Sequence, residues 1–154
     1  TKRLGIPNGE KLNRTIVEFY YKDDALQDPL VSEEHIITFG WASQNELDEI
    51  TSLALRVNDF LAGYFSAIKI QLVDFKIEFG RLYKNDEVYV VLADEISPDS
   101  CRLWDSQTKQ KMDKDVYREN SGYLLDGYNE VAKRMGLLTQ NGASKNKKPT
   151  LVKG

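Results

Sequence analysis

A long amphipathic pattern in the first half of the chain most strongly limits how this sequence can fold. Ser43 and Glu46 have the spacing of a capping box, in which each side chain accepts a hydrogen bond from a backbone amide at a helix N-terminus. Apolar residues then recur every three or four positions, at Leu47, Ile50, Ala54, Val57, Leu61 and Tyr64. The pattern predicts a helix of about five or six turns that ends near Ser66.

Period-two patterns on both sides of this helix predict β-strands. Residues 14–22 (RTIVEFYYK) are rich in β-branched and aromatic residues and predict a strand, whereas the polar residues 23–35, interrupted by Pro29, predict a loop. Residues 68–80 and 87–97 predict two more strands, joined as a hairpin by a short polar turn around Asn85. A helix packed against antiparallel strands predicts an α+β fold with a twisted antiparallel sheet.

The register of this hairpin depends on the length of its turn. A three-residue loop, Asn85 to Glu87, places Glu78 directly opposite Asp94, and this is the register that we expect. A two-residue loop instead turns these two side chains to opposite faces of the hairpin.

The last third of the chain is predicted to hold an irregular stretch, a second helix and a tail. Residues 97–114 show no clear period, and the next element is expected to begin near Asp115. Its first turns are expected to be irregular because of Gly122 and Gly127, and Gly136 stands where a left-handed C-cap glycine belongs. Its apolar stripe is Leu124, Tyr128, Val131, Ala132 and Met135. We expect one domain over 1–138 and a frayed polar, basic tail over 139–154.

Composition excludes several classes of protein. The 21 basic and 24 acidic residues give a net charge of −3, which argues against a dedicated nucleic-acid binder. No apolar run approaches the ~20 residues of a membrane span, so no membrane partner is expected. Cys101 stands alone, which favours an inert thiol in a reducing compartment such as the cytoplasm.

His35 is expected to be a loop residue. The chain lacks an initiator methionine, so we expect a fragment.

The segment VDFKIEFG, residues 73–80, carries the first indication of chemistry. Phe75, Ile77 and Phe79 alternate with Asp74, Lys76 and Glu78, so a single strand would bury the first set and present the second set on its other face. On spacing alone, a solvated outer face of an antiparallel sheet is the simpler interpretation.

Residues near this segment favour a functional interpretation. Asp94 ends the partner strand, so carboxylates gather at one end of the predicted hairpin, and Arg102 and Arg118 follow. Carboxylate oxygens suit Mg²⁺, and arginine donors suit phosphate or carboxylate groups. Together these residues point to phosphoryl chemistry, in which positioning and charge neutralisation carry most of the catalysis.

The ordered runs VEFYYKDDALQDPL, VDFKIEFG, LADEISPDSCRLWD and MDKDVYR resemble the SAICAR synthetase (phosphoribosylaminoimidazole-succinocarboxamide synthase) family. The resemblance covers about residues 1–138. It implies an ATP-dependent ligase of purine biosynthesis that joins L-aspartate to carboxyaminoimidazole ribonucleotide through an acyl phosphate and yields SAICAR, ADP and phosphate. As the charge balance indicates, no nucleic-acid partner is expected, and a homo-oligomer stays open.

The same resemblance implies roles for the acidic and basic residues of the hairpin. Glu78 and Asp94 match the carboxylates that bind Mg²⁺ near the ATP phosphates. Asp74 and Lys76 match catalytic positions that line the nucleotide and imidazole substrate.

Four further residues are implied to bind substrate. Arg102 and Arg118 match arginines that contact the anionic groups of the substrate, and Lys22 and Asp28 match a loop near the substrate site. Ser97 and Asp99 are expected to shape the turn that aims Arg102.

The resemblance is to the C-terminal lobe of a two-lobed family. The glycine-rich loop and lysine that cover the ATP phosphates in the other lobe have no match here, so we expect little ligase activity from this chain alone. A non-catalytic module that binds Mg²⁺ and nucleotide phosphate is the alternative. A protein kinase–like phosphotransferase shares the logic of two carboxylates, but the chain lacks the catalytic-loop and Asp-Phe-Gly patterns.

Overall fold

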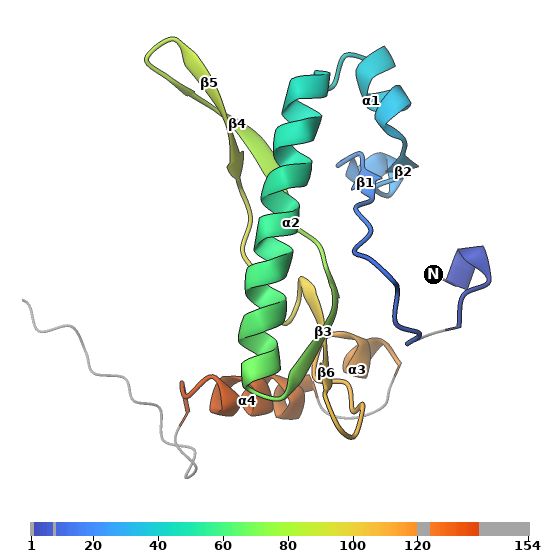
Figure 1. Cartoon of the computed structure of the whole chain (residues 1–154), viewed down its shortest axis with the longest axis vertical. Coiled ribbons are helices and arrows are strands. Elements are labelled where there is room, and N and C mark those ends of the chain that lie inside the picture. The colour runs from blue at the N-terminus through green and yellow to red at the C-terminus, as the bar shows by residue number, and fades with distance from the viewer. Residues whose placement is uncertain (1, 8, 120–123, 139–154) are drawn as a thin grey trace, which may run out of the picture. The chain divides into compact units, whose positions relative to one another are not determined.

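A computed structural model describes residues 2–7, 9–119 and 124–138 and shows an α+β fold (Figure 1). Its strands are β1 (Phe19–Tyr20), β2 (Leu30–Val31), β3 (Ile70–Phe75), β4 (Phe79–Lys84), β5 (Glu87–Leu92) and β6 (Cys101–Asp105). Its α-helices are α1 (Glu33–Thr38), α2 (Gln44–Ala67), α3 (Asp115–Arg118) and α4 (Leu124–Arg134), and its 3₁₀ helices are η1 (Lys2–Leu4) and η2 (Asp24–Leu26). Within the described ranges the strands form three antiparallel pairs, β1–β2, β3–β6 and β4–β5. The α+β class is confirmed.

The chain divides into two compact units. Unit 1 comprises Thr1–Leu61 and Ile77–Glu95, and unit 2 comprises Ala62–Lys76 and Ile96–Gly154. The chain passes between the units three times: after Leu61 within α2, between Lys76 and Ile77, and between Glu95 and Ile96. We describe each unit by itself.

Helix α2 forms as its sequence pattern predicts. The backbone amide of Ser43 donates to Oε2 of Glu46 at 2.8 Å, and the amide of Glu46 donates to Oγ of Ser43 at 3.3 Å, which completes the capping box. Leu47 and Leu61 of the predicted stripe are buried, and so is Phe65. Among the helices of the described segments, none is long and apolar enough to cross a membrane.

The segment before α2 differs from the prediction. Of the predicted strand 14–22, only Phe19–Tyr20 forms a β-strand. Its partner, Leu30–Val31, also has only two residues, so the ladder extends no further. The predicted loop 23–35 contains η2, β2 and the first turn of α1. His35 is therefore not a loop residue. Its Nδ1 accepts from the amide of Ser32 at 3.2 Å, while Oγ of Ser32 accepts from the amide of His35 at 3.3 Å. Histidine takes the place that glutamate or glutamine has in the usual capping box.

The β4–β5 hairpin turns on two residues, so the expected three-residue register is wrong. Lys84 pairs with Glu87, and Asn85 and Asp86 adopt positive φ values of 51° and 61°. Two-residue turns of this kind match the right-handed twist of the strands, and asparagine and aspartate tolerate the left-handed backbone that they need. The carbonyl of Glu78 consequently accepts from the amide of Ala93 at 2.9 Å, so the residue opposite Glu78 is Ala93 and not Asp94, as the three-residue loop predicted.

Residues 68–80 do not form one strand. They break at residues 76–78 into β3 and β4, and β3 pairs with β6 instead of with the hairpin. The predicted irregular stretch 97–114 thus contains a strand. Its burial explains why the alternation test missed it: Cys101, Leu103 and Trp104 are all buried, so apolar and polar residues do not alternate regularly along β6. Phe75, Ile77 and Phe79 were expected in the core, but each is only half-buried.

The end of unit 2 confirms the predicted C-cap. Gly136 has a φ of 73°, its amide donates to the carbonyl of Lys133, and the amide of Leu137 donates to that of Ala132, both at 2.9 Å. These two bonds define a Schellman motif. A methyl group added at Gly127 would lie 3.0 Å from Cα of Met112, which explains a glycine inside α4. Gly122 and the predicted tail 139–154 lie outside the described residues.

Candidate active site

The eight predicted site residues form two sets, one in each unit. Unit 1 holds Lys22, Asp28, Glu78 and Asp94; unit 2 holds Asp74, Lys76, Arg102 and Arg118. No group of three or more His, Cys, Asp or Glu side chains within the described ranges is arranged to hold a metal ion by itself.

In unit 1 the base of the hairpin brings Lys22 together with two carboxylates. Glu78 directly precedes β4, and Asp94 follows the end of β5 by two residues. The bond from Ala93 to Glu78 therefore holds the two strand ends side by side. Nζ of Lys22 donates to Oε2 of Glu78. This hydrogen bond, and to a smaller degree the charges of Glu78, Asp94 and Asp24, raise the pKa of Lys22 against the opposing effect of desolvation.

The chemistry of this pair fits a magnesium site. Glu78 and Asp94 supply carboxylate oxygens, the ligand type that Mg²⁺ prefers, and the ion commonly takes only one or two carboxylates together with phosphates and water. The ammonium group of Lys22 shows that positive charge is stabilised at Glu78.

Asp28 lies in a tight local loop. Its Oδ1 accepts from the amide of Asp23 at 3.0 Å, and Oδ1 of Asp23 accepts from the amide of Leu26 at 3.0 Å. Gln27 and Asp28 both have positive φ values, 59° and 48°. These contacts give Asp28 a turn-forming role, and its predicted contact with substrate stays a prediction.

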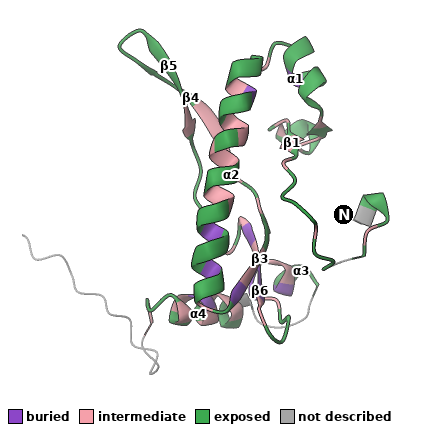
Figure 2. Ribbon diagram, viewed as in Figure 1, coloured by how far each residue is buried: buried purple, intermediate pink, exposed green. Residues whose placement is uncertain are grey.

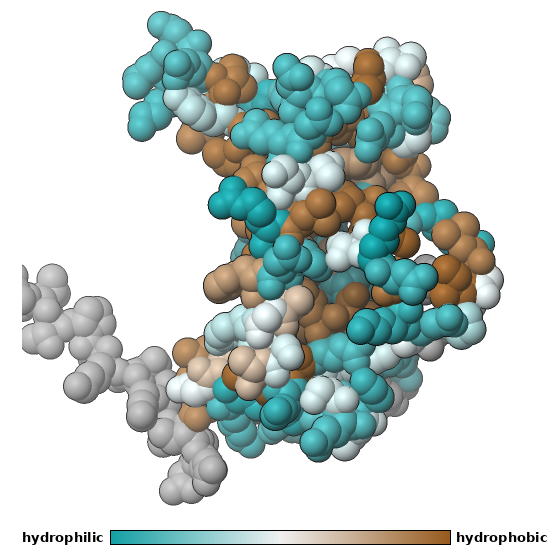
Figure 3. Space-filling view, viewed as in Figure 1, coloured by the Kyte–Doolittle hydropathy of each residue, from teal (hydrophilic) through white to brown (hydrophobic). Residues whose placement is uncertain are grey.

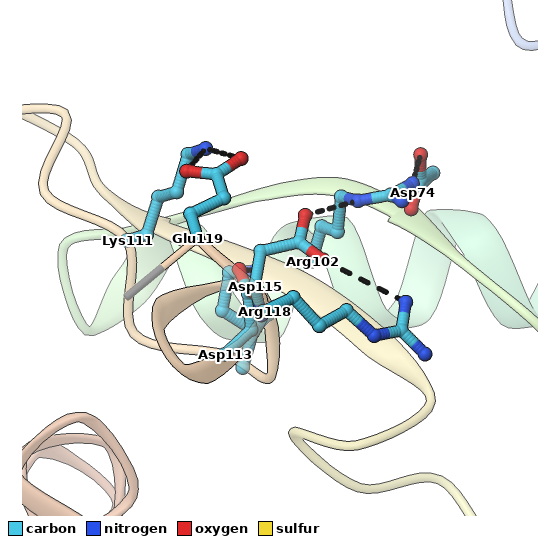
Figure 4. A network of polar contacts seen from close by, with 8 residues as sticks. Asp74, Arg102, Lys111, Asp113, Asp115, Arg118 and Glu119 are labelled. Carbon is cyan, nitrogen blue, oxygen red and sulfur yellow. Dashed lines mark hydrogen bonds and ion pairs between the residues drawn. The ribbon is translucent and has the colours of Figure 1, made fainter. Parts of the chain in front are cut away.

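In unit 2, Arg102 is held between two carboxylates. Its Nη1 lies 2.7 Å from Oδ2 of Asp74, its neighbour across the β3–β6 ladder, and its Nε lies 2.6 Å from Oδ2 of Asp115 (Figure 4). Burial lowers the pKa of Arg102, but hydrogen bonds and charge from Asp115 and Asp74 outweigh that effect and raise it. Nη1 of Arg118 lies 3.8 Å from Oδ1 of Asp115. The structure therefore brings both predicted arginines to one carboxylate.

The turn before β6 is built as predicted from Ser97. The amide of Ser97 donates to Oγ of Ser100 at 3.0 Å, and the amide of Asp99 donates to Oγ of Ser97 at 3.2 Å. The amide of Lys76 donates to the carbonyl of Ser100 at 2.8 Å, and Lys76 itself is exposed. The turn thereby leads into β6, whose second residue is Arg102.

Sequence reasoning missed two aspartates in this region. Asp115 holds Arg102, and Asp113 is completely buried, with 0% of its surface exposed. Oδ2 of Asp113 accepts from the amide of Leu103 at 2.7 Å, and Oδ1 accepts from the amide of Asp115 at 2.8 Å. Burial raises the pKa of Asp113, and the two amide donors oppose the rise. The available signal was the pair Asp113 and Asp115, two positions apart and flanked by the apolar residues Met112 and Val116.

Comparison with known proteins places these residues in a family. The family model described as SAICAR synthetase matches residues 1–135. The chain belongs to the SAICAR synthetase family. The resemblance inferred from the sequence is thereby confirmed.

Curated relatives agree with this assignment. The phosphoribosylaminoimidazole-succinocarboxamide synthase of Sinorhizobium medicae is 60% identical over 153 residues, which are 99% of this chain and 60% of that protein. The synthase of Rhodospirillum centenum is 56% identical over 152 residues. The chain spans about 60% of the length of the curated relatives that it matches.

Solved SAICAR synthetases share the fold. The crystal structure of the synthase from Ehrlichia chaffeensis superposes with a TM-score of 0.84 and 47% identity, covering 90% of this chain and 59% of that one. A SAICAR synthetase in complex with ADP superposes with a TM-score of 0.81 at 47% identity. The superposition covers 87% of this chain and 56% of that protein's chain.

Proposed function

We propose that this chain takes part in the ATP-dependent ligation of L-aspartate to carboxyaminoimidazole ribonucleotide, in the cytoplasm. The observation that carries the proposal is the 60% identity, over 99% of the chain, with a phosphoribosylaminoimidazole-succinocarboxamide synthase. A structural neighbour in complex with ADP supports the use of a nucleotide.

The reaction requires that a carboxylate become a competent electrophile. A carboxylate oxygen of the ribonucleotide attacks the γ-phosphorus of ATP, the bond to the β-phosphate oxygen breaks, and ADP leaves. The aspartate amine then attacks the acyl carbon, the acyl C–O bond to phosphate breaks, and the nitrogen loses a proton. SAICAR, ADP and phosphate result. The proposed residues hold and neutralise the anionic groups during both steps.

The set in unit 1 is proposed to hold the phosphates. Glu78 and Asp94 would bind Mg²⁺, which neutralises phosphate charge when it is bound. Lys22 is already protonated and hydrogen-bonded to Glu78, so it would retain its positive charge close to the phosphates. Asp28 would keep the preceding loop closed through the amide of Asp23.

The set in unit 2 is proposed to bind the imidazole ribonucleotide and its reacting carboxylate. Arg102 and Arg118 present guanidinium donors, whose planar fork matches carboxylate and phosphate oxygens. Asp74 would orient Arg102 through the 2.7 Å ion pair. Lys76 would place an ammonium group beside the developing negative charge.

Calorimetric titration with ATP and Mg²⁺ tests the metal assignment. We expect Glu78→Ala and Asp94→Ala each to weaken binding by about tenfold or more, because one charged ligand is lost. Glu49→Ala, which removes an exposed carboxylate of α2 in the same unit, is the matched control and should leave binding unchanged. Unchanged binding in both site variants would remove these residues from the metal role.

Turnover tests the ligase assignment. The chain is assayed alone and as a chimera in which it replaces its matched segment of the Sinorhizobium medicae synthase. We expect SAICAR formation by the chimera and its loss in Glu78→Ala, with Glu49→Ala active. ATP binding without turnover in either protein would instead support the non-catalytic module.

A further inference from the structure

The completely buried carboxylate of Asp113 has no role in the proposed reaction. A buried carboxylate is unfavourable unless its oxygens are hydrogen-bonded, and here each oxygen takes one backbone amide. Its burial near Leu103, Met112 and Val116, which are themselves buried, excludes direct contact with a substrate.

The two amides that Asp113 binds belong to two different elements. Leu103 directly follows Arg102 in β6, whereas Asp115 is the first residue of α3, the helix that carries Arg118. A single side chain therefore ties the strand of one predicted substrate arginine to the helix of the other.

Asp115 completes the connection. Once its backbone is held by Oδ1 of Asp113, its own carboxylate lies 2.6 Å from Nε of Arg102 and 3.8 Å from Nη1 of Arg118. The side chain of Asp115 is only 14% exposed, compared with 40% for Arg102 and 59% for Arg118. The inner end of this network is buried and its outer end faces solvent, as expected for a binding group that is held from behind by hydrogen bonds.

We propose that Asp113 is a positioning residue that fixes Arg102 and Arg118 relative to each other through Asp115. The identity of the bound anion rests on the proposed function, whereas the support of the two arginines does not. A carboxylate is required because both amides are donors. The isosteric Asp113→Asn variant retains one acceptor oxygen and presents an amide group to the other donor.

The first experiment follows the guanidinium group directly. In the ¹⁵N-labelled chain, solvent exchange of the Arg102 Nε–H is measured by NMR. We expect Asp113→Asn to accelerate this exchange about tenfold, because release of the Asp115 backbone weakens the charged hydrogen bond. The Nε–H of Arg81, which is paired with Glu46 in unit 1, should not change. Asp126→Asn, on exposed α4 surface, is the control variant. An Arg102 exchange rate that stays unchanged in a folded Asp113→Asn chain would overturn the proposal.

The second experiment separates positioning from general stability. In the chimera described above, Asp113→Asn is expected to raise KM for the imidazole ribonucleotide about tenfold while KM for ATP stays constant. A purely structural role would lower the melting temperature and leave both KM values of the folded enzyme unchanged, which would contradict the proposal. If the unaltered chimera makes no SAICAR, the proposed function fails, and the exchange of Arg102 still decides the role of Asp113.

Discussion

The β3–β6 and β4–β5 ladders are both two-stranded and antiparallel, and β3 and β4 come from one short stretch of sequence, yet they are stabilised differently. In β3–β6, Ile70 is 1% exposed and Leu103 0% exposed, and Cys101 and Trp104 are also buried. No residue of β4 or β5 is buried (Figure 2). Tyr83 at the end of β4 is 73% exposed. An isolated two-stranded ladder is marginally stable in water, so hydrophobic burial can stabilise the first ladder but contributes little to the second.

Polar contacts take the place of burial in the hairpin. Arg81 of β4 reaches the first turn of α2, where its Nε lies 2.5 Å from Oε1 of Glu46, and its Nη2 donates to the carbonyl of Trp41 at 2.9 Å. The tip, residues 84–87, carries polar side chains, which are teal in the space-filling view (Figure 3). The hairpin should therefore respond to charge and turn chemistry, whereas the β3–β6 ladder should respond to changes in volume.

Truncation of a leucine in each ladder should give the largest contrast. Leu103→Ala removes a completely buried side chain and should destabilise unit 2 by about 2–5 kcal/mol. Leu82→Ala, in β4, removes a side chain that is 48% exposed and should cost less than about 1 kcal/mol. Hydrogen exchange of the ladder amides measures both changes. Equal losses in the two ladders would break the comparison.

Two helix glycines test the packing beside β6. The amide of Met112 donates to the carbonyl of Leu103, and a methyl group at Gly127 would lie 3.0–3.1 Å from backbone atoms of Met112. Gly127→Ala should therefore destabilise unit 2 by about 1–3 kcal/mol. Gly63→Ala, where α2 has open space, should instead stabilise the chain by about 0.5–1 kcal/mol. Thermal unfolding of the two variants checks the opposite signs, and destabilisation by both would contradict this account.

Acid should weaken the attachment of the hairpin. Hydrogen bonds from Arg81 and Ser43 lower the pKa of Glu46 from 4.5 to about 2. A carboxyl group with a lowered folded-state pKa stabilises the fold above its unfolded pKa, and this contribution is lost as the pH falls from 4.5 toward 2. Glu46→Gln should therefore be less stable than the unaltered chain at pH 7 and should lose less stability over this pH range.

The fluorescence of Trp41 reports this acid transition in a Trp104→Phe background, which leaves Trp41 as the only tryptophan. Glu49→Gln serves as the control because its carboxylate is exposed on α2. Identical acid profiles for Glu46→Gln and the unaltered chain would rule out this attachment.

The smallest expected effect concerns the hairpin turn. Asp86 has a φ of 61°, which glycine adopts without steric cost. Asp86→Gly should stabilise the hairpin by less than about 1 kcal/mol, because relief of the left-handed strain exceeds the added entropy of the unfolded chain, and Asp86→Ala should destabilise it. Amide exchange in β4 and β5 measures the change. A destabilising Asp86→Gly would show that the aspartate side chain, and not the backbone, determines the stability of the turn.

The contrast extends to the proposed site. Arg102 stands on the buried ladder and is supported by Asp113 and Asp115, so its position is determined by packed elements. Glu78 and Asp94 flank the base of the exposed hairpin, where one backbone bond joins the strand ends. We expect substitutions in the hairpin to change metal binding more than they change the arginine network.

Local sequence patterns predicted the elements whose stability is local. The capping box of Ser43 and Glu46, the end of α2 near Ser66 and the C-cap at Gly136 all depend on residues a few positions apart, and all are confirmed. The family was recognised from ordered motifs that span most of the chain, and the comparison confirms it. The roles of the eight site residues stay predictions.

The sequence by itself determined the α+β class, the long helix and the family, because periodicity, caps and motif order are written along the chain. Only the tertiary structure decided that VDFKIEFG breaks at residues 76–78, that β3 pairs with CRLWD, and that the buried carboxylate of Asp113 binds the amides of Leu103 and Asp115. The physical reason is that strand pairing and burial depend on residues distant in sequence. The alternation of residues 73–80 is compatible with pairing to β5 or to β6, and only the packing of the whole fold selects between these two strands.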